Sequence, residues 1–562
     1  MKKITGAGAS PGVIVGAVYV VSRSDAPMPE FDDPKAALAT AVSAASNQLV
    51  SLRDQAEASG RAEAAQILGA QSLMAEDPML VDAVEEQLDE GIDLGTALST
   101  AGKQISDMLA AMDDPYLAAR SADVLEVADR VRLHLTGGTD QGLDSVTEPS
   151  VVVATHLTAA DTAQMDPNMV LGFVTEQGGP TGHVAVIARS LGIPAIVGTS
   201  GAVAAADGTS VIGIDGATGE IVLDPDDQTL EQLESRRKAH LAAEEAATAY
   251  KGKPAAFGER RVLIAANIGN EKDLAQAVAQ GADGVGLYRT EFLFLERTEA
   301  PSEDEQYETY RSAVASFDHP VVIRTLDIGG DKPADYLETP VEENPFLGER
   351  AVRLYEGAGD VFLSQARALL RAATAGELWV MVPMIATVAD WDVVTGLFDV
   401  ARKQLDERGE THGTPRFGMM VEVPAAAVAA EQLARRVDFF SIGTNDLTQY
   451  TMAADRTNAR LNAYSDAAHP AVLRLCNMTA TAARNAGISV AVCGESAADP
   501  VTGALFAAMG INELSVAPTS VNRTKSLIDQ VDPETISDAL TKALGADSAA
   551  DVRSLVTPLL GR

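Results

Sequence analysis

Hydrophobic and polar positions follow different periods in different parts of this chain. A Gly-rich turn near the N-terminus leads into a β-branched strand, VIVGAVYVV. From about residue 32 to residue 134 the pattern changes to long segments of Ala, Leu, Glu and Gln, which are typical of helices. Pro34 and Pro78, each directly after an aspartate, stand where helices begin. The pattern predicts a helical bundle over residues 23–145.

Short β-branched strands return between residues 150 and 225. They read SVVVAT, MVLGFVTE, AIVG, TSVIGID and GEIVLD, with Gly, Pro and Asp between them, and the helix HVAVIARSLG lies between two of them. The N-terminal strand can complete the same α/β unit. We therefore expect an α/β domain formed by residues 1–22 and 146–227, with the bundle as an insertion. Residues 228–258 read as a connecting helix.

Strand and helix patterns then alternate from residue 259 to residue 562. The candidate strands are VLIAANI, GVGLYR, VVIRTLD, LWVMVPMI, FGMMVEV, FFSIGTN, SVAVCGE and ELSVAP. Eight such units in succession predict a (β/α)₈ barrel, and an open doubly wound sheet is the alternative. The expected fold class is thus a multidomain α/β chain that ends in a barrel.

The composition and charge of the chain limit the classes of partner that we expect it to bind. Apolar residues make up 46% and charged residues 22%, as in ordinary soluble proteins, and the absence of an uncharged apolar run of 18 residues predicts no membrane insertion. Two cysteines fit a reducing cytoplasm. The net charge of −37 makes nucleic acid a poor partner and favours a basic protein.

In a (β/α)₈ barrel the chemistry lies at the carboxyl ends of the strands. The candidate residues at or just after those ends are Arg289, Arg324, Glu422, Asn445, Asp446, Arg456 and Cys493. The three arginines can hold phosphate and carboxylate oxygens in pairs, the two acidic side chains suit Mg²⁺, and the thiol can exchange a proton. Phosphoenolpyruvate is a ligand with those groups.

Other roles are open for each of these residues. A single arginine at a strand end often forms a structural ion pair. Glu422 stands between two valines, so a buried carboxylate there needs a metal or an arginine in either case. Cysteines on strands usually pack in the core. Cys476, inside a helical pattern, is expected to do so.

His183 is the candidate phosphoryl acceptor in the first half of the chain. Gly178, Gly179 and Gly182 allow a ligand to approach the backbone closely, and Thr181 can cap a helix that begins near His183. A helix N-terminus stabilises a phosphate, and neutral histidine is a competent nucleophile. The alternative is a histidine near a helix cap that has no chemical role.

Several long segments resemble one family. GVGLYRTEFLF, VIRTLDIGGDK, ENPFLGERAVR, MVEVPAAA, DFFSIGTNDLTQYTMAADR and VCGE are similar to signature segments of enzyme I of the bacterial sugar phosphotransferase system, a phosphoenolpyruvate–protein phosphotransferase. GAGASPGVIVG and GGPTGHVAVIARSLGIPAIVG resemble the same family. The likeness extends over essentially the whole chain.

The resemblance implies a role for each candidate. His183 matches the histidine phosphorylated at Nε2, and Cys493 matches the acid that protonates the enolate. The residues that match the phosphoenolpyruvate site are Arg289, Arg324, Asn445, Asp446 and Arg456, and those that match the Mg²⁺ ligands are Glu422 and Asp446. The enzyme would phosphorylate itself, pass the group to a histidine of the carrier protein HPr and release pyruvate, the first step of sugar transport by this system.

The resemblance also assigns the domains. Residues 1–22 and 146–227 match a swivelling phosphohistidine domain, residues 23–145 the HPr-binding bundle, residues 228–258 a linker helix, and residues 259–562 the substrate-binding barrel, which also forms a homodimer. Pro180 and Gly182 stand where the family usually has Arg and Ser. Two rivals are a dikinase or synthase, which needs an ATP-binding domain, and a regulatory relative with little turnover.

Overall fold

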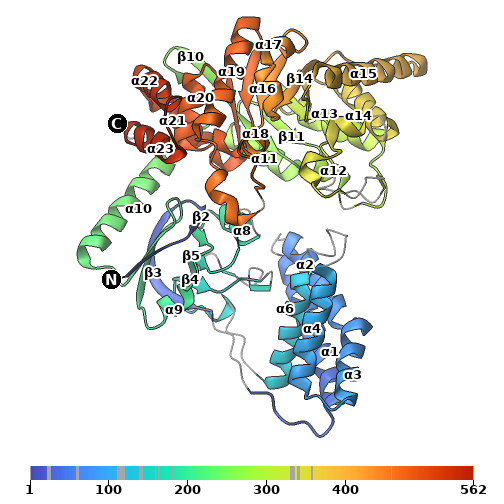
Figure 1. The fold of residues 1–562 in the computed structure, drawn as a ribbon, viewed down its shortest axis with the longest axis vertical. Coiled ribbons are helices and arrows are strands. Elements are labelled where there is room, and N and C mark those ends of the chain that lie inside the picture. The colour runs from blue at the N-terminus through green and yellow to red at the C-terminus, as the bar shows by residue number, and fades with distance from the viewer. Residues whose placement is uncertain are drawn as a thin grey trace. The chain divides into compact units, whose positions relative to one another are not determined.

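The computed structural model describes residues 2–21, 27–58, 62–110, 121–137, 143–158, 160–161, 165–166, 168–178, 183–295, 297–329, 336–337, 342–355, 359–456 and 458–560. The chain forms two compact units, Met1–Ala242 and Ala243–Arg562, and the boundary falls inside helix α10 (Asp227–Thr248) (Figure 1). The domain boundaries expected from the sequence stay predictions.

The first unit contains an eight-stranded sheet in the order β1-β8-β7-β3-β4-β5-β6-β2. Its strands are β1 Lys2–Thr5, β2 Ala7–Ser10, β3 Val13–Val20, β4 Ser150–Ala154, β5 Val170–Thr175, β6 Ala195–Val197, β7 Val211–Asp215 and β8 Glu220–Leu223. The N-terminal strand β3 pairs in parallel with β4, on the far side of the helical segment in sequence. The expected α/β unit with an inserted bundle is therefore confirmed.

Side chains of β4 alternate between two apolar clusters, one on each face of the sheet. Val151 and Val153 pack with helix α9 (Ala202–Ala206), and Val152 packs in the cluster that includes helix α8 (His183–Leu191). Successive residues of a strand point to opposite faces, which explains the alternation. The valine-rich strands are thus covered on both sides.

The N-terminal Gly-rich segment differs from the expected turn. It forms the short strands β1 and β2, which pair antiparallel with β8 and β6. A Cβ atom added at Gly8 would meet the backbone oxygen of Gly216. Its glycines serve close backbone approach within a sheet, and sequence alone does not separate that use from a turn.

The inserted segment is helical, as predicted. Its described helices are α1 Pro34–Ala58, α2 Ala62–Ala75, α3 Pro78–Asp89, α4 Leu94–Ala110 and α6 Ser121–Thr136. Asp77 caps α3 because its side chain accepts a hydrogen bond from the Met79 amide at 2.8 Å, with Pro78 in the first turn. Leu49, Leu68 and similar side chains are fully buried between the helices.

The second unit is a closed barrel of eight parallel strands. They are β10 Arg260–Ile268, β11 Val285–Arg289, β12 Val321–Arg324, β13 Leu378–Val382, β14 Arg416–Val421, β15 Phe439–Ile442, β16 Ser489–Val492 and β17 Glu513–Val516. β10 pairs in parallel with both β17 and β11, which closes the sheet. This pairing excludes the open-sheet alternative and confirms the predicted barrel. The extra strand β9 (Ala255–Phe257) pairs antiparallel with β10.

Helices surround the barrel strands. They are α11 Glu271–Gln280, α12 Glu291–Phe294, α13 Glu303–Ala315, α14 Gly359–Ala372, α15 Val388–Arg408, α16 Pro424–Val428, α17 Ala430–Leu433, α18 Thr444–Met452, α19 Pro470–Ala486, α20 Pro500–Ala508, α21 Val521–Gln530, α22 Pro533–Ala543 and α23 Ala549–Val556. Cys476 lies fully buried in α19, as expected. None of the helices in the described ranges is long and apolar enough to cross a bilayer.

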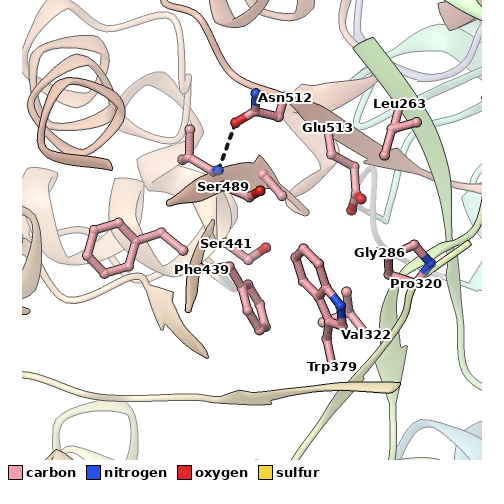
Figure 2. A pocket seen from close by; sticks show the side chains of 13 residues that line it. Leu263, Gly286, Pro320, Val322, Trp379, Phe439, Ser441, Ser489, Asn512 and Glu513 are labelled. Carbon is pink, nitrogen blue, oxygen red and sulfur yellow. Dashed lines mark hydrogen bonds between the residues drawn. The ribbon is translucent and has the colours of Figure 1, made fainter. Parts of the chain in front are cut away.

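The two ends of the barrel interior differ. Near the amino-terminal ends of the strands a cavity of about 40 Å³ lies among inward-facing side chains (Figure 2). At the carboxyl ends, β12 ends at Arg324, and Glu422 and Cys493 directly follow β14 and β16. Asp446 lies in the first turn of α18 and not in a strand. Charged candidates are thus concentrated at one end.

Gln365 of α14 connects this helix to the segments that follow β11 and β12. Its Oε1 accepts a hydrogen bond from the Leu326 amide at 2.9 Å, and its Nε2 donates to the hydroxyls of Thr290 and Tyr310. All four residues are buried. Gln365 therefore holds the backbone next to Arg324 through neutral contacts.

Replacing Gln365 by Leu should lower the free energy of unfolding of the barrel by about 2 kcal/mol, because the Leu326 amide would be left buried without an acceptor. Both tryptophans, Trp379 and Trp391, lie in this unit, so tryptophan fluorescence during denaturation reports the unfolding of the barrel unit alone. The exposed Gln432→Leu is the control, with a change within about 0.5 kcal/mol. Equal effects of the two variants would contradict the role of Gln365.

Candidate active site

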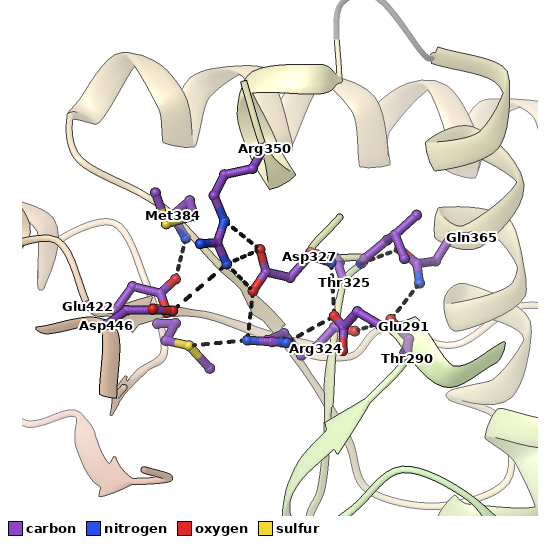
Figure 3. Close-up of polar contacts among 12 residues, drawn as sticks. Thr290, Glu291, Arg324, Thr325, Asp327, Arg350, Gln365, Met384, Glu422 and Asp446 are labelled. Carbon is purple, nitrogen blue, oxygen red and sulfur yellow. Dashed lines mark hydrogen bonds and ion pairs between the residues drawn. The ribbon is translucent and has the colours of Figure 1, made fainter. Parts of the chain in front are cut away.

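Arg324 is the centre of a buried network of charges at the carboxyl end of the barrel. Its guanidinium lies 2.9 Å from Glu291 Oε1 and 2.9 Å from Asp327 Oδ2. Burial lowers the pKa of this guanidinium, but Glu291 and Asp327, with Glu422, outweigh that effect and leave the pKa above its usual value. Figure 3 shows Arg324 between Glu291 on one side and the pair Glu422 and Asp446 on the other. Its charge is therefore fixed and pre-oriented.

Arg350 adds a second buried guanidinium above the first. Only 1% of its side chain is exposed, and it contacts both oxygens of Asp327 at 2.9 Å. The same guanidinium lies 3.8 Å from Asp446 Oδ2, and Arg456 contacts Asp446 Oδ1 at 2.9 Å. Asp446 thus connects the buried arginine to the partly exposed Arg456, which brings two of the residues named from the sequence into direct contact.

Glu422 is a buried carboxyl group among charges of both signs. Burial raises the pKa of its carboxyl to about 8; Asp446 and Asp327 act in the same direction, while Arg324 and Arg350 oppose them. Its Oε1 accepts a hydrogen bond from the Met384 amide at 2.6 Å. A group of this kind gives up its proton when a cation arrives.

Two non-glycine residues beside these groups have a left-handed backbone. Ala351, directly after Arg350, has φ 52°, and Met384, which binds Glu422, has φ 60°. Such conformations cost about 1–3 kcal/mol and persist only where the surroundings hold them. The backbone on both sides of the charge network is therefore under constraint, as is common at functional sites.

Cys493 lies deeper, among apolar side chains. It packs with Met420, Phe439 and other inward-facing residues, and its Sγ lies 3.7 Å from the backbone oxygen of Ile442. Burial raises the pKa of the thiol to about 11. The thiol is therefore protonated at neutral pH, the state that a proton donor needs.

The remaining candidates surround these groups in different ways. Asn445 accepts a hydrogen bond through Oδ1 from the Glu495 amide at 3.2 Å, which joins α18 to the loop after β16. Arg289 ends β11, and its charge opposes the rise that burial causes in the pKa of the Cys493 thiol. Within the part of the chain that the structure describes, the Arg289 guanidinium has no hydrogen bond or ion pair. It is therefore a cation that an anionic ligand can engage directly.

The histidine candidate belongs to the other unit. Helix α8 begins at His183, as the sequence predicts, after Gly178 with φ 99°. The proposed cap Thr181 and the unusual Pro180 and Gly182 lie outside the described residues.

Comparison with known proteins adds independent evidence. Residues 5–120, 146–219 and 243–533 match the family models described as PEP-utilising enzyme, N-terminal; PEP-utilising enzyme, mobile domain; and PEP-utilising enzyme, PEP-binding domain. The phosphoenolpyruvate-protein phosphotransferase of Haloferax volcanii is 42% identical over 99% of both chains. The protein of that name from Bacillus subtilis is 36% identical, again over 99% of both. The chain belongs to the phosphoenolpyruvate-protein phosphotransferase family.

This family consists of enzymes, and the resemblance predicted from the sequence motifs is confirmed. The relative from Latilactobacillus sakei is 38% identical and is matched over 97% of its length and 98% of this chain. An NMR solution structure of Enzyme I (nEIt) is 29% identical, covers 42% of this chain and 99% of its own, and has a TM-score of 0.37.

Three charged side chains of the network lie outside the set of residues predicted from the strand ends. Arg350 lies in the loop segment after β12, within the motif ENPFLGERAVR, where no strand end points to it. Glu291 and Asp327 lie close in sequence to the predicted Arg289 and Arg324. Glu291 forms a buried ion pair with Arg324, and Asp327 forms one with Arg350.

Glu422 and Asp446 fit a magnesium ion by their chemistry. Both are buried hard oxygen donors, and the charge of Asp446 raises the pKa of Glu422, so a cation between them would relieve repulsion. Mg²⁺ typically takes one or two carboxylates and completes its shell with water and substrate oxygens. In the described ranges no group of three or more His, Cys, Asp or Glu converges on a metal position.

The raised pKa of Glu422 predicts a pH dependence of stability in the magnesium-free protein. The folded state keeps this proton up to about pH 8, whereas the unfolded chain releases it at about 4.3. Unfolding free energy should therefore fall as the pH rises between these values. Glu422→Gln should flatten the slope in tryptophan-detected denaturation, and the exposed Glu377→Gln should retain it. Equal slopes in wild type and Glu422→Gln would contradict the prediction.

Proposed function

We propose that this protein transfers the phosphoryl group of phosphoenolpyruvate to His183 and then to a histidine of HPr, releasing pyruvate. The observation that supports this most strongly is the cluster of charges at the barrel mouth, in a chain whose full-length relatives are named phosphoenolpyruvate-protein phosphotransferase. Arg324 and Arg350 are held there by carboxylates, while Arg289 has no partner within the described residues.

Phosphoenolpyruvate carries a phosphate and a carboxylate, and both suit guanidinium groups. In this proposal Arg289, Arg324 and Arg456 bind the ligand, together with Asn445 and Asp446. Arg350 lies 3.8 Å from Asp446 and keeps that carboxylate in place. Positioning and charge neutralisation supply most of the catalysis in phosphoryl transfer.

The transfer step forms a bond between phosphorus and His183 Nε2 and breaks the bond between phosphorus and the enol oxygen. Glu422 and Asp446 would hold Mg²⁺, which supplies charge neutralisation at the phosphate and the developing enolate. The start of helix α8 favours the phosphohistidine through its free amide groups. Because His183 and the arginines belong to different compact units, the proposal includes movement of the phosphohistidine domain.

Cys493 completes the reaction as the acid. The electron pair of the enolate forms the keto group, and the methylene carbon takes the thiol proton, which yields pyruvate. The high pKa of the thiol supports this role because the proton is present at neutral pH. The other cysteine, Cys476, is remote from this chemistry in a helix core.

The remaining parts of the proposal concern partners. The helical bundle, residues 23–145, is the proposed HPr-binding domain. The barrel is the proposed dimerisation domain, and Val428 of α16 and Met478 of α19 are exposed apolar side chains on contacting helices of that unit. A cytoplasmic location and a role in sugar transport follow from the same resemblance.

His183→Ala should abolish the phosphoenzyme, because the acceptor nitrogen is removed. The measurement is incubation with labelled phosphoenolpyruvate and Mg²⁺, followed by mapping of an acid-labile phosphate by mass spectrometry. His240→Ala, on α10, is the matched control and should be labelled as wild type is. A stable phosphohistidine in His183→Ala would contradict the assignment.

Cys493→Ala should slow pyruvate formation by about 100-fold, the typical contribution of a positioned acid. Phosphorylation of His183 in a single turnover should be much less affected, because that step precedes protonation. Pyruvate and phosphoenzyme are measured in the same quenched samples. Cys476→Ala is the control, and unchanged pyruvate formation in Cys493→Ala would remove Cys493 from this role.

A further inference from the structure

Polar side chains occupy one side of the barrel interior, where branched apolar residues usually dominate. Ser441 of β15, Ser489 of β16, and Glu513 and Ser515 of β17 lie on neighbouring strands. Asn267 of β10 receives a hydrogen bond from Ser515 at 2.6 Å and donates one to the backbone oxygen of Cys493 at 3.1 Å. The polar groups therefore extend from the amino-terminal end of the barrel to the proposed acid.

The cavity at that end brings two unsatisfied polar groups to one space. Ser441, Ser489 and Glu513 line it, opposite an aromatic wall of Trp379 and Phe439 whose ring centres lie 4.8 Å apart (Figure 2). Neither the Ser441 hydroxyl nor Glu513 Oε1 has a hydrogen-bond partner among the described residues, although both atoms are out of contact with solvent. Buried polar atoms normally find a partner, so both imply water.

The volume of the cavity agrees with this inference. About 40 Å³ is enough for more than one water molecule, and the lining offers hydroxyl and carboxyl groups to hold them. A Cβ atom added at Gly286 would meet both Glu513 Oε1 and Ser515 Oγ, so only glycine leaves these two groups room at this point. The wall of the cavity is thus shaped around the carboxyl group.

Ser441 connects the cavity to Cys493. It belongs to β15, whose next residue, Ile442, accepts the hydrogen bonds of the Cys493 amide and thiol. The Ser441 hydroxyl is near enough to counter the rise in the pKa of that thiol. Ser441 thus faces the cavity on one side and influences the acid on the other.

Glu513 can exchange protons near neutral pH. Burial raises the pKa of its carboxyl to about 7, and Asp283 acts in the same direction. Asp283 is itself paired with Lys525 at 3.1 Å, and Arg261 lies 3.9 Å away. Although Oε1 is out of contact with solvent, the residue as a whole is half-buried at the amino-terminal end of β17, so the relay includes return of its proton from solvent at this end.

We propose that Glu513 and Ser441, with water in this cavity, form a relay that returns a proton to the Cys493 thiolate after each turnover. Ser441 gives its hydroxyl proton to Sγ and takes one from the water, which takes one from the Glu513 carboxyl; solvent then reprotonates Glu513. No bond other than those to hydrogen changes. The inference rests on the proposed role of Cys493 as the acid.

The relay predicts a burst of product. The thiol begins each experiment protonated, so the first turnover does not use Glu513, whereas the relay through Glu513 is the faster route for every later one. In Glu513→Gln, with HPr and phosphoenolpyruvate in excess, one pyruvate per chain should form at the wild-type rate. The rate should then fall about ten-fold, at the low end of proton-transfer effects because solvent can also enter from the substrate side. Rapid-quench sampling of pyruvate measures both phases.

Ser441→Ala removes only a hydroxyl and should give the same burst. This variant tests the relay on its own if Glu513→Gln folds poorly. Glu377→Gln, an exposed glutamate that accepts a hydrogen bond from Trp379 of the cavity wall, should match wild type. The steady-state rate of wild type should fall as the pH rises past about 7, and this decline should be absent in Glu513→Gln.

The outcomes separate the relay from the role of Cys493. If progress curves of Glu513→Gln and Ser441→Ala show no burst while Cys493→Ala loses pyruvate formation, the relay is wrong and the acid assignment stands. If Cys493→Ala forms pyruvate normally, both are overturned. A burst in both relay variants and not in Glu377→Gln supports the relay.

Discussion

The ion pair between Arg350 and Asp327 lies where neither side chain is more than 1% exposed, and Asp327 also holds Arg324. Removing one member of such a set leaves a buried charge without compensation, which costs about 3–5 kcal/mol. The arginines are therefore fixed before any ligand binds. Donors that need no rearrangement are the ones that stabilise developing charge most effectively. The geometry of the mouth depends on this shared carboxylate.

The dependence of Arg324 and Arg350 on Asp327 also explains which parts of the site could be predicted from the sequence. Eight β-branched runs separated by turn residues were enough to predict the barrel, and the rule of strand ends located Arg324, Glu422 and Cys493. Arg350 lies in a loop, and its position is set by contacts with Asp327 and by the bridge between Gly329 and Arg350, which no local periodicity records. Side chains carried by regular strands are predictable, while those fixed by long-range pairing are not.

Glu422 and Glu513 are carboxyl groups whose different surroundings suit them to different chemical roles. Glu422 is surrounded by charges of both signs, and its raised pKa follows from burial together with Asp446 and Asp327. Glu513 lies at the other end, among hydroxyls and aromatic rings, and its pKa is raised mainly by burial. Glu422 is therefore suited to bind a cation that displaces its proton. Glu513 is suited to store and release a proton without any cation.

Cys493 lies between the charge network at the carboxyl end of the barrel and the polar cavity at the amino-terminal end. Apolar neighbours keep its thiol protonated, which an acid requires, but the same neighbours limit the access of solvent to the thiolate. A charged donor placed against the thiol would disturb the arginines and carboxylates above it, because unscreened charges interact strongly in a buried site. A neutral hydroxyl such as Ser441 passes a proton without adding charge. Burial of the proposed acid therefore favours a polar path through the barrel interior over a second charged group at the mouth.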